Sequence, residues 1–99
     1  MKEIFYALDQ EFESRVRLGI MSILMVNDFA EFKTLKTHLD LTDGNLSSHL
    51  IGLEKAGYIQ VKKQFIDRKP NTTYTVSKKG KKAFEDHLKV LETLIKKKI

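Results

Sequence analysis

Cysteine and tryptophan are absent from this chain of 99 residues, and proline occurs once. Without cysteine the protein has no disulfide bond, no thiolate metal site and no cysteine nucleophile, so its fold depends on packing alone. Long apolar runs are also absent, because the stretch from Ile20 to Val26 contains Ser22 and is far shorter than the roughly 20 residues of a membrane span. We therefore predict a small protein that does not span a bilayer.

The first ten residues carry Glu3 and Asp9 and contain neither a signal-peptide core nor a small-residue cleavage site. We therefore expect a cytoplasmic protein, with one domain over residues 1–99. A chain of this size buries only about 60 to 65% of the surface that its unfolded form exposes. A second subunit that covers more apolar surface would stabilise it, so a homodimer is expected.

The charge is divided unevenly along the chain. Residues 1–57 hold six basic and nine acidic side chains, whereas residues 58–99 hold twelve basic and four acidic ones, which gives −3 and +8 and a total of +5. Such polarity is typical of a surface that meets a polyanion, either nucleic acid or an acidic membrane surface. A lysine-rich solvated face is the alternative.

Three helices are predicted within residues 14–57. Ser14 is suited to cap the first helix, and residues 33–39 form the second after a short extended link at 29–32. Thr42 is suited to cap the third helix, and Gly57 provides the left-handed residue that ends it. The third helix carries an apolar stripe for the core, formed by Leu46, Leu50 and Leu53.

After Gly57 the apolar period changes from 3.6 to 2, which predicts a β-hairpin over residues 58–76. Turn chemistry covers residues 67–71, and a β-branched strand follows at 72–76. Arg68 and Lys69 make the tip of this hairpin basic, and we expect Pro70 to restrict its conformation.

A last helix is predicted over residues 77–99, with Ser77 as its N-cap, and another over residues 1–13. Their apolar stripes have no place in a three-helix core, so we expect them to meet across a two-fold axis as dimerisation helices. Packing of the two helices on one another within one subunit is the alternative. The predicted interface consists of Ile4, Phe5, Leu8, Phe12, Phe84, Leu88, Leu91 and Ile95.

The order of these elements is typical of a winged helix-turn-helix, a mainly α fold with a small β-hairpin. Within it, residues 39–59 strongly resemble the recognition-helix region of the MarR and ArsR transcriptional regulators. Residues 67–80 look like the wing and following helix of their compact single-domain relatives, and residues 15–21 resemble their first helix. The resemblance implies a homodimeric, sequence-specific regulator that binds double-stranded DNA at a pseudo-palindromic operator.

If the leucine stripe of the third helix faces the core, Gly44, Ser48, Ile51 and Lys55 lie on the opposite side. Groove contacts come mainly from the N-terminal part of such a helix. For His49, at the rim of the leucine stripe, a groove contact and a packing role in the core are both left open. Ile51 either packs under the first helix or indicates that the helix fits the groove differently from the family pattern. The predicted contacts from this helix are Thr42, Gly44, Asn45, Ser47, Ser48 and His49.

Phosphate and minor-groove contacts are expected from the hairpin, unless its charges only keep the protein soluble. Arg15 is expected to pair with an acid such as Glu11 or Glu13, whereas Arg17 is open to either a structural or a backbone-contacting role. The remaining predicted DNA contacts are Lys62, Lys63, Arg68, Lys69, Asn71 and Arg17.

No enzyme, metal site or cofactor is predicted. His38, His49 and His87 lie on three separate elements without partners at ligand spacing, and no Ser/His/Asp set or phosphate loop is present. The alternatives to a sequence-specific regulator are an architectural DNA binder with low sequence preference and a winged helix used for protein contacts. A small-molecule effector is left open.

Overall fold

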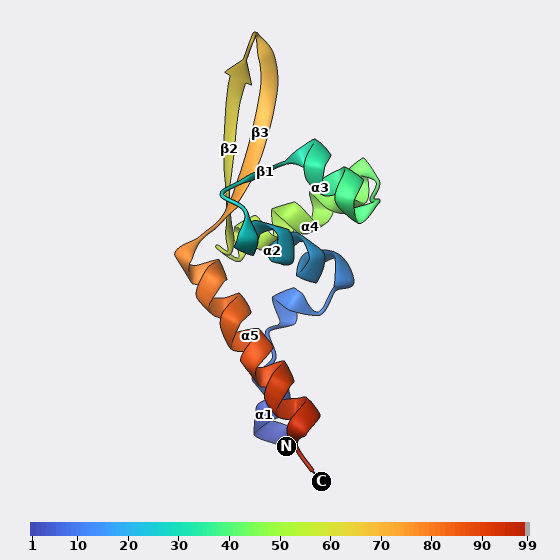
Figure 1. Cartoon of the computed structure of the whole chain (residues 1–99), viewed down its shortest axis with the longest axis vertical. Helices are drawn as coiled ribbons and strands as arrows, with labels where there is room; N and C mark the ends of the chain where they lie inside the picture. The colour runs from blue at the N-terminus through green and yellow to red at the C-terminus, as the bar shows by residue number, and fades with distance from the viewer. Residues whose placement is uncertain (99) are drawn as a thin grey trace.

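A helical body separates two projecting ends in the computed structural model, which describes residues 1–98 (Figure 1). The molecule measures 58 × 25 × 21 Å, with the β2–β3 hairpin at one end of its long axis and α1 beside the far end of α5 at the other. In chain order the elements are α1 (Lys2–Tyr6), the 3-10 helix η1 (Gln10–Phe12), α2 (Arg15–Val26), β1 (Ala30–Glu31), α3 (Phe32–Leu39), α4 (Asp43–Lys55), β2 (Ile59–Ile66), β3 (Lys69–Val76) and α5 (Lys78–Lys96).

Local capping chemistry sets the helix boundaries. The side-chain hydroxyls of Ser14, Thr42 and Ser77 each accept a hydrogen bond from the backbone N–H three residues later, at 3.3, 3.2 and 2.9 Å. Gly57 has a φ of +81°, just after the end of α4. These three caps and the glycine stop confirm the predicted starts of α2, α4 and α5 and the predicted end of α4.

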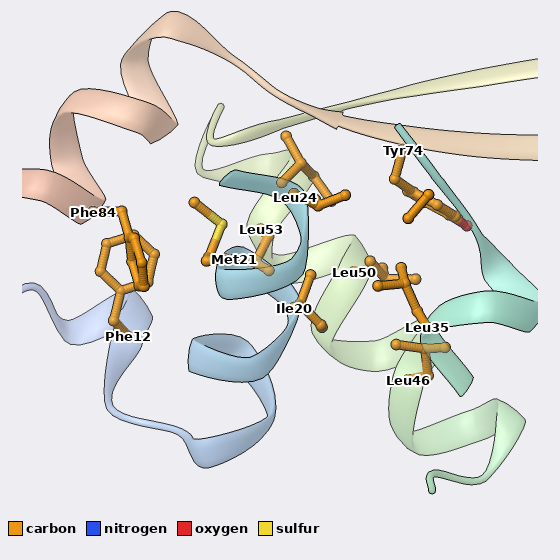
Figure 2. Close-up of a cluster of buried hydrophobic side chains, with 12 residues drawn as sticks. Phe12, Ile20, Met21, Leu24, Leu35, Leu46, Leu50, Leu53, Tyr74 and Phe84 are labelled. Atoms are coloured by element: carbon orange, nitrogen blue, oxygen red, sulfur yellow. The ribbon is translucent and has the colours of Figure 1, made fainter. Parts of the chain in front are cut away.

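The core forms where α2, α3 and α4 meet below the sheet (Figure 2). The stripe of Leu46, Leu50 and Leu53 on α4 is fully or almost fully buried, as predicted. Ile20 and Leu35 complete the contact from α2 and α3. Because this stripe occupies one side of α4, the opposite side of the helix is left free for another molecule.

The short link before α3 forms an edge strand, β1, which was predicted only as an extended segment. The sheet has the order β1-β3-β2 and is antiparallel, with Ala30 opposite Tyr74 and Glu31 opposite Thr73. Two residues are too few to show a period of 2, so this pairing has no sequence signal of its own.

The turn of the hairpin is shorter than predicted. It contains only Asp67 and Arg68, both with positive φ (51° and 64°), between the paired residues Ile66 and Lys69. Pro70, which was predicted within the turn, lies in β3 opposite Phe65, one residue after the pair that flanks the turn. Pro70 is tolerated because the pair after the hydrogen-bonded turn pair needs no N–H across the ladder, and β1 does not extend this far.

The N-terminal segment is not one helix over residues 1–13. α1 ends at Tyr6, and after a break the chain enters η1, where the Asp9 side chain accepts a hydrogen bond from the backbone N–H of Glu11. The Asp9 N–H donates to Nδ1 of buried His87 on α5 at 3.1 Å, and its carboxylate accepts from the Tyr58 hydroxyl. The segment is therefore attached to α5 and the start of β2.

Two of the predicted interface residues belong to the core of the single chain. Phe12 is 1% exposed and Phe84 4% exposed, and their rings meet edge to face at 5.2 Å (Figure 2). The prediction that they line a dimer interface is wrong, because η1 brings Phe12 back onto the first turns of α5. α1 likewise lies beside α5 of the same chain (Figure 1), the arrangement considered as the alternative.

Within residues 1–98, no helix is long and apolar enough to cross a membrane. The same residues contain no group of three or more His, Asp or Glu side chains that could hold a metal ion. The last helix ends at Lys96, and Ile99, the final residue of the helix predicted over 77–99, lies outside the described residues.

Candidate nucleic-acid interface

The outer side of α4 is exposed as the sequence predicted. Gly44, Ser48, Ile51 and Lys55 are all exposed, as is Asn45 on the flank of the same side. A Cβ added at position 44 would meet no atom of another part of the chain within 4 Å, so another molecule can approach the backbone closely at the N-terminal turn of α4. The first turns of this face offer short polar groups and a helix N-terminus, and Lys55 near the end of α4 is the charged side chain among these residues.

The start of α4 is held in place by contacts that do not use its outer side. The Thr42 hydroxyl accepts the N–H of Asn45, and the Lys36 ammonium on α3 lies 2.7 Å from the Asp43 carboxylate. Thr42 is exposed and Ser47 is half-buried. The Asn45 side chain has no hydrogen-bond partner within residues 1–98, so it is available for a base edge.

Arg17, which was included among the predicted DNA contacts but left open between a structural and a backbone-contacting role, has partners within the molecule. Its guanidinium pairs with the Glu11 carboxylate and donates from Nε to Nδ1 of His49 on α4 at 3.1 Å. The Arg17 side chain is only 20% exposed. Arg15, for which an acidic partner was predicted, is exposed and has none within residues 1–98, because Glu11 reaches Arg17 instead.

Gly52 lies beneath this arginine. A Cβ at position 52 would come within 2.9 Å of Cζ of Arg17, which shows that the guanidinium packs directly on the α4 backbone. Glycine therefore serves here to admit Arg17 rather than to contact DNA.

His49 is half-buried on the flank of α4, neither in the core nor on the outermost line of the helix. Burial and the positive charge of Arg17 lower the pKa of His49 below its ordinary value of 6.5. The imidazole is therefore neutral at pH 7, with one ring nitrogen acting as acceptor and the other as donor.

The wing places its lysines on opposite faces of the sheet. Lys63 shares with Val61 the face toward α4, where both line a shallow cavity of about 200 Å³ with Ser47, Ile51 and Glu54. Lys62 and Asn71 lie on the other face, in a cavity with Phe29 and Glu31. The prediction treated these residues as one surface, but the period of a strand places Lys62 and Asn71 on the face away from α4.

Ile51 is 51% exposed and lies on the wing side of α4. It does not pack under α2, which was one of the two predicted arrangements. Together with Glu54 it places apolar and acidic groups between helix and wing, so this part of the surface differs from a uniformly basic groove.

The tip of the wing is basic and apolar at once. Arg68 and Lys69 are exposed, and so are Phe65 (77%) and Ile66 (50%) just before the turn. Sequence reasoning assigned Phe65 only to the strand pattern. Phe65 lies near the end of an eight-residue strand that extends beyond the helical body, so its ring has no core to pack against. The distance of Phe65 from the predicted helices along the strand could have indicated this exposure.

Two of the lysines at the start of α5 have partners inside the molecule. The Lys79 ammonium donates to the carbonyl oxygen of Ala56 at 3.0 Å and lies 5.6 Å from the centre of the Tyr58 ring. Lys82 pairs with Asp86 one turn later. Burial and the hydrogen bond to Asp9 raise the pKa of Tyr58 to about 12, so this ring stays neutral. Lys79 therefore links α5 to the segment between α4 and β2, whereas the pair of Lys82 and Asp86 lies within α5.

Comparison with known proteins was consistent with this geometry. Residues 16–95 match the winged helix DNA-binding domain family. An uncharacterized protein of Methanocaldococcus jannaschii is 39% identical over 77 residues, which cover 78% of this chain and 84% of the relative.

Solved structures confirm the winged helix fold. The transcriptional regulator homologue from Pyrococcus horikoshii has a TM-score of 0.87 at 33% identity, covering 97% of this chain and 96% of that one. A MarR family regulator from Enterococcus faecalis has a TM-score of 0.77 at 22% identity, covering 96% of this chain and 87% of that one. At this level of identity the similarity supports a common fold only. The family and the fold are those of DNA-binding regulators, which are not enzymes.

Proposed function

Because the chain belongs to the winged helix DNA-binding domain family, we propose that it is a transcriptional regulator that binds a specific, pseudo-palindromic operator as a homodimer. In this proposal α4 enters the major groove and the tip of the wing reaches the neighbouring minor groove and phosphates. The protein acts in the cytoplasm, and no cofactor is required.

The observation that carries the proposal is the pairing of two unlike surfaces. The outer side of α4 offers uncharged donors and acceptors at Asn45 and Ser48, which suit base edges. The wing beside it offers exposed positive charge at Lys63, Arg68 and Lys69, which suits phosphates. Sequence selection and affinity are thus assigned to different elements.

The dimer is proposed from apolar surface that one chain leaves uncovered. On α5, Leu88 is 45% exposed and Ile95 82% exposed, and Phe5 of α1 is also exposed nearby. α5 has 19 residues and is about 28 Å long, so its far half extends beyond the core on which Phe84 packs. A second copy that covers this end would present two recognition helices about 34 Å apart.

Selection of binding sites from random duplexes by the purified protein tests the proposal. We expect a pseudo-palindrome with half-sites one helical turn apart, and affinity that falls steeply with salt. Retention of all duplexes within a few-fold would indicate an architectural binder instead. Retention of none would indicate a winged helix that contacts an acidic protein.

Asn45→Ala is expected to cost about 1 to 3 kcal/mol of binding to the selected operator and to relax the preference at one base position. The reason is that the exposed amide can pair bidentately with an adenine edge, which alanine cannot do. Affinities for the operator and for variants at each position, measured at one salt concentration, give this result. Equal weakening on every duplex would show that Asn45 does not read a base.

Arg68→Asn is expected to weaken binding to all duplexes by a similar factor and to lower the salt slope by about 1. Asparagine is chosen because position 68 has a φ of 64°, which asparagine tolerates, so the turn is kept while the charge is lost. Lys89→Gln on α5 is the matched control, because it removes one exposed positive charge far from the wing. Equal salt slopes for the two variants would contradict a local role for Arg68.

A further inference from the structure

A side-chain hydrogen bond joins α2 to the recognition helix. Nε of Arg17 donates to Nδ1 of His49 at 3.1 Å. A guanidinium has only donors, so Nδ1 must be an unprotonated acceptor. A neutral imidazole whose Nδ1 carries no proton has its proton on Nε2, so the hydrogen bond from Arg17 selects one of the two tautomers.

The guanidinium is held on two further sides. The Glu11 carboxylate on η1 pairs with Nη1, and the backbone of Gly52 lies against Cζ. Together with His49, these groups hold the guanidinium of Arg17 on α2 from two other elements, η1 and α4. Arg17 is therefore clamped in the orientation that fixes His49, and it is not free to extend toward a phosphate.

The other ring nitrogen of His49 is open. Nε2 has no hydrogen-bond partner within residues 1–98, and it is not among their buried unpartnered polar atoms, so solvent reaches it. His49 lies one helical turn after Asn45 on the same flank of α4. A donor is thus presented beside the amide that is proposed to read an adenine.

We infer that His49 donates from Nε2 to a purine N7 in the major groove, and that Arg17 is a positioning residue for this contact rather than a DNA ligand. The inference rests on the proposed function and assigns two residues within it. Since Nδ1 is occupied, His49 can pair with acceptors such as N7 and cannot pair with the amino groups of cytosine or adenine. It therefore contributes sequence preference, not only affinity.

The tautomer is tested on the free protein by nitrogen-15 NMR of the imidazole at pH 7.5. We expect the Nε2–H form of His49 alone in the wild type. Gly52→Ala is expected to displace Arg17, which gives a mixture of tautomers and moves the pKa of His49 toward 6.5, and Arg17→Met is expected to do the same. Gly44→Ala is the matched control in the same helix, because its added methyl meets open space.

A His49 ring protonated on Nδ1 in the wild type would overturn the inference, because Arg17 could not then donate to it. Signals of His49 that stay unchanged in both Arg17→Met and Gly52→Ala would overturn it as well. Neither outcome depends on DNA binding, so this test is separate from that of the proposed function.

The groove contact is tested by replacing each purine of the selected operator with its 7-deaza analogue. We expect one position in each half-site where the analogue weakens wild-type binding about 5-fold and does not weaken binding of His49→Ala. His49→Gln, whose amide N–H reaches as far as Nε2, is expected to keep the effect. His49→Asn, which reaches only as far as Nδ1, is expected to lose it.

Equal effects of every analogue on wild type and His49→Ala would overturn the base contact. Coupling of His49 to a methylphosphonate at one phosphate, instead of to a purine, would also overturn it. A wild-type protein that selects no duplex would overturn the proposed function and the groove contact together, whereas the wrong tautomer would overturn this inference alone.

Discussion

Replacing Leu88 and Ile95 together with glutamate is expected to give a monomer and to weaken binding to the full operator by about 100-fold or more. The two side chains are the exposed apolar groups of α5 that we propose to lie at the two-fold axis. Carboxylates there would lose water without gaining partners. Each half-site would then be bound by itself, without the effective concentration that a linked second site provides.

Sedimentation equilibrium and titrations with full and half operators measure this effect. The control is Lys89→Gln with Thr93→Glu, which changes the net charge by the same two units on the exposed opposite side of α5. We expect the control to remain dimeric. A wild-type protein that is monomeric at tens of micromolar, or a glutamate variant that stays dimeric, would contradict the interface.

Gly80→Ala is expected to lower the free energy of unfolding by about 3 kcal/mol or more. Gly80 is buried in the first turn of α5, and an added Cβ would lie 2.7 and 2.8 Å from the carbonyl carbon and Cα of Tyr58. The neighbour is backbone, and it is held by the hydrogen bond from Ser77 N–H to Tyr58 O at 3.0 Å. The clash can be relieved only by moving α5 away from the start of β2.

Urea or thermal unfolding of Gly80→Ala and of Gly44→Ala separates this clash from helix propensity. Alanine is favoured over glycine in helices by up to about 1 kcal/mol, so the control at position 44 is expected to be as stable as the wild type or slightly more stable. A Gly80→Ala protein with wild-type stability would contradict the close approach of α5 to β2. Native proteins are typically stable by about 5 to 15 kcal/mol, so a loss of this size is easy to detect.

The local signals in the sequence predicted the elements that depend on neighbouring residues. Thr42 and Gly57 mark the two ends of α4 because a cap and a left-handed residue act within a few positions of themselves. The buried side of α4 followed from the spacing of Leu46 and Leu50, because helical geometry alone places them together. The exposed side of α4 consists of the positions that remain, on the side of the helix opposite these leucines.

The sequence predicted which residues contribute to the candidate nucleic-acid interface, but it did not predict which of them contact one another or share a face. Arg15 and Arg17 are both near acids in sequence, and nothing in their spacing shows that Glu11 of η1 turns toward Arg17. Lys62 and Lys63 are neighbours in sequence, yet a strand places their side chains on opposite faces. The predicted turn was too long and included Pro70, because a turn of two residues can be built from Asp67 and Arg68 without it.

The sequence by itself determined the winged helix order, the buried stripe of α4 and the concentration of positive charge after Gly57, since period, caps and charge are local properties. Only the tertiary structure decided that Phe12 and Phe84 fill the core of one chain and leave Leu88 and Ile95 uncovered. It also decided that Arg17 turns inward to His49. Such contacts join residues far apart in sequence, and their energies depend on burial and charge that no short segment contains.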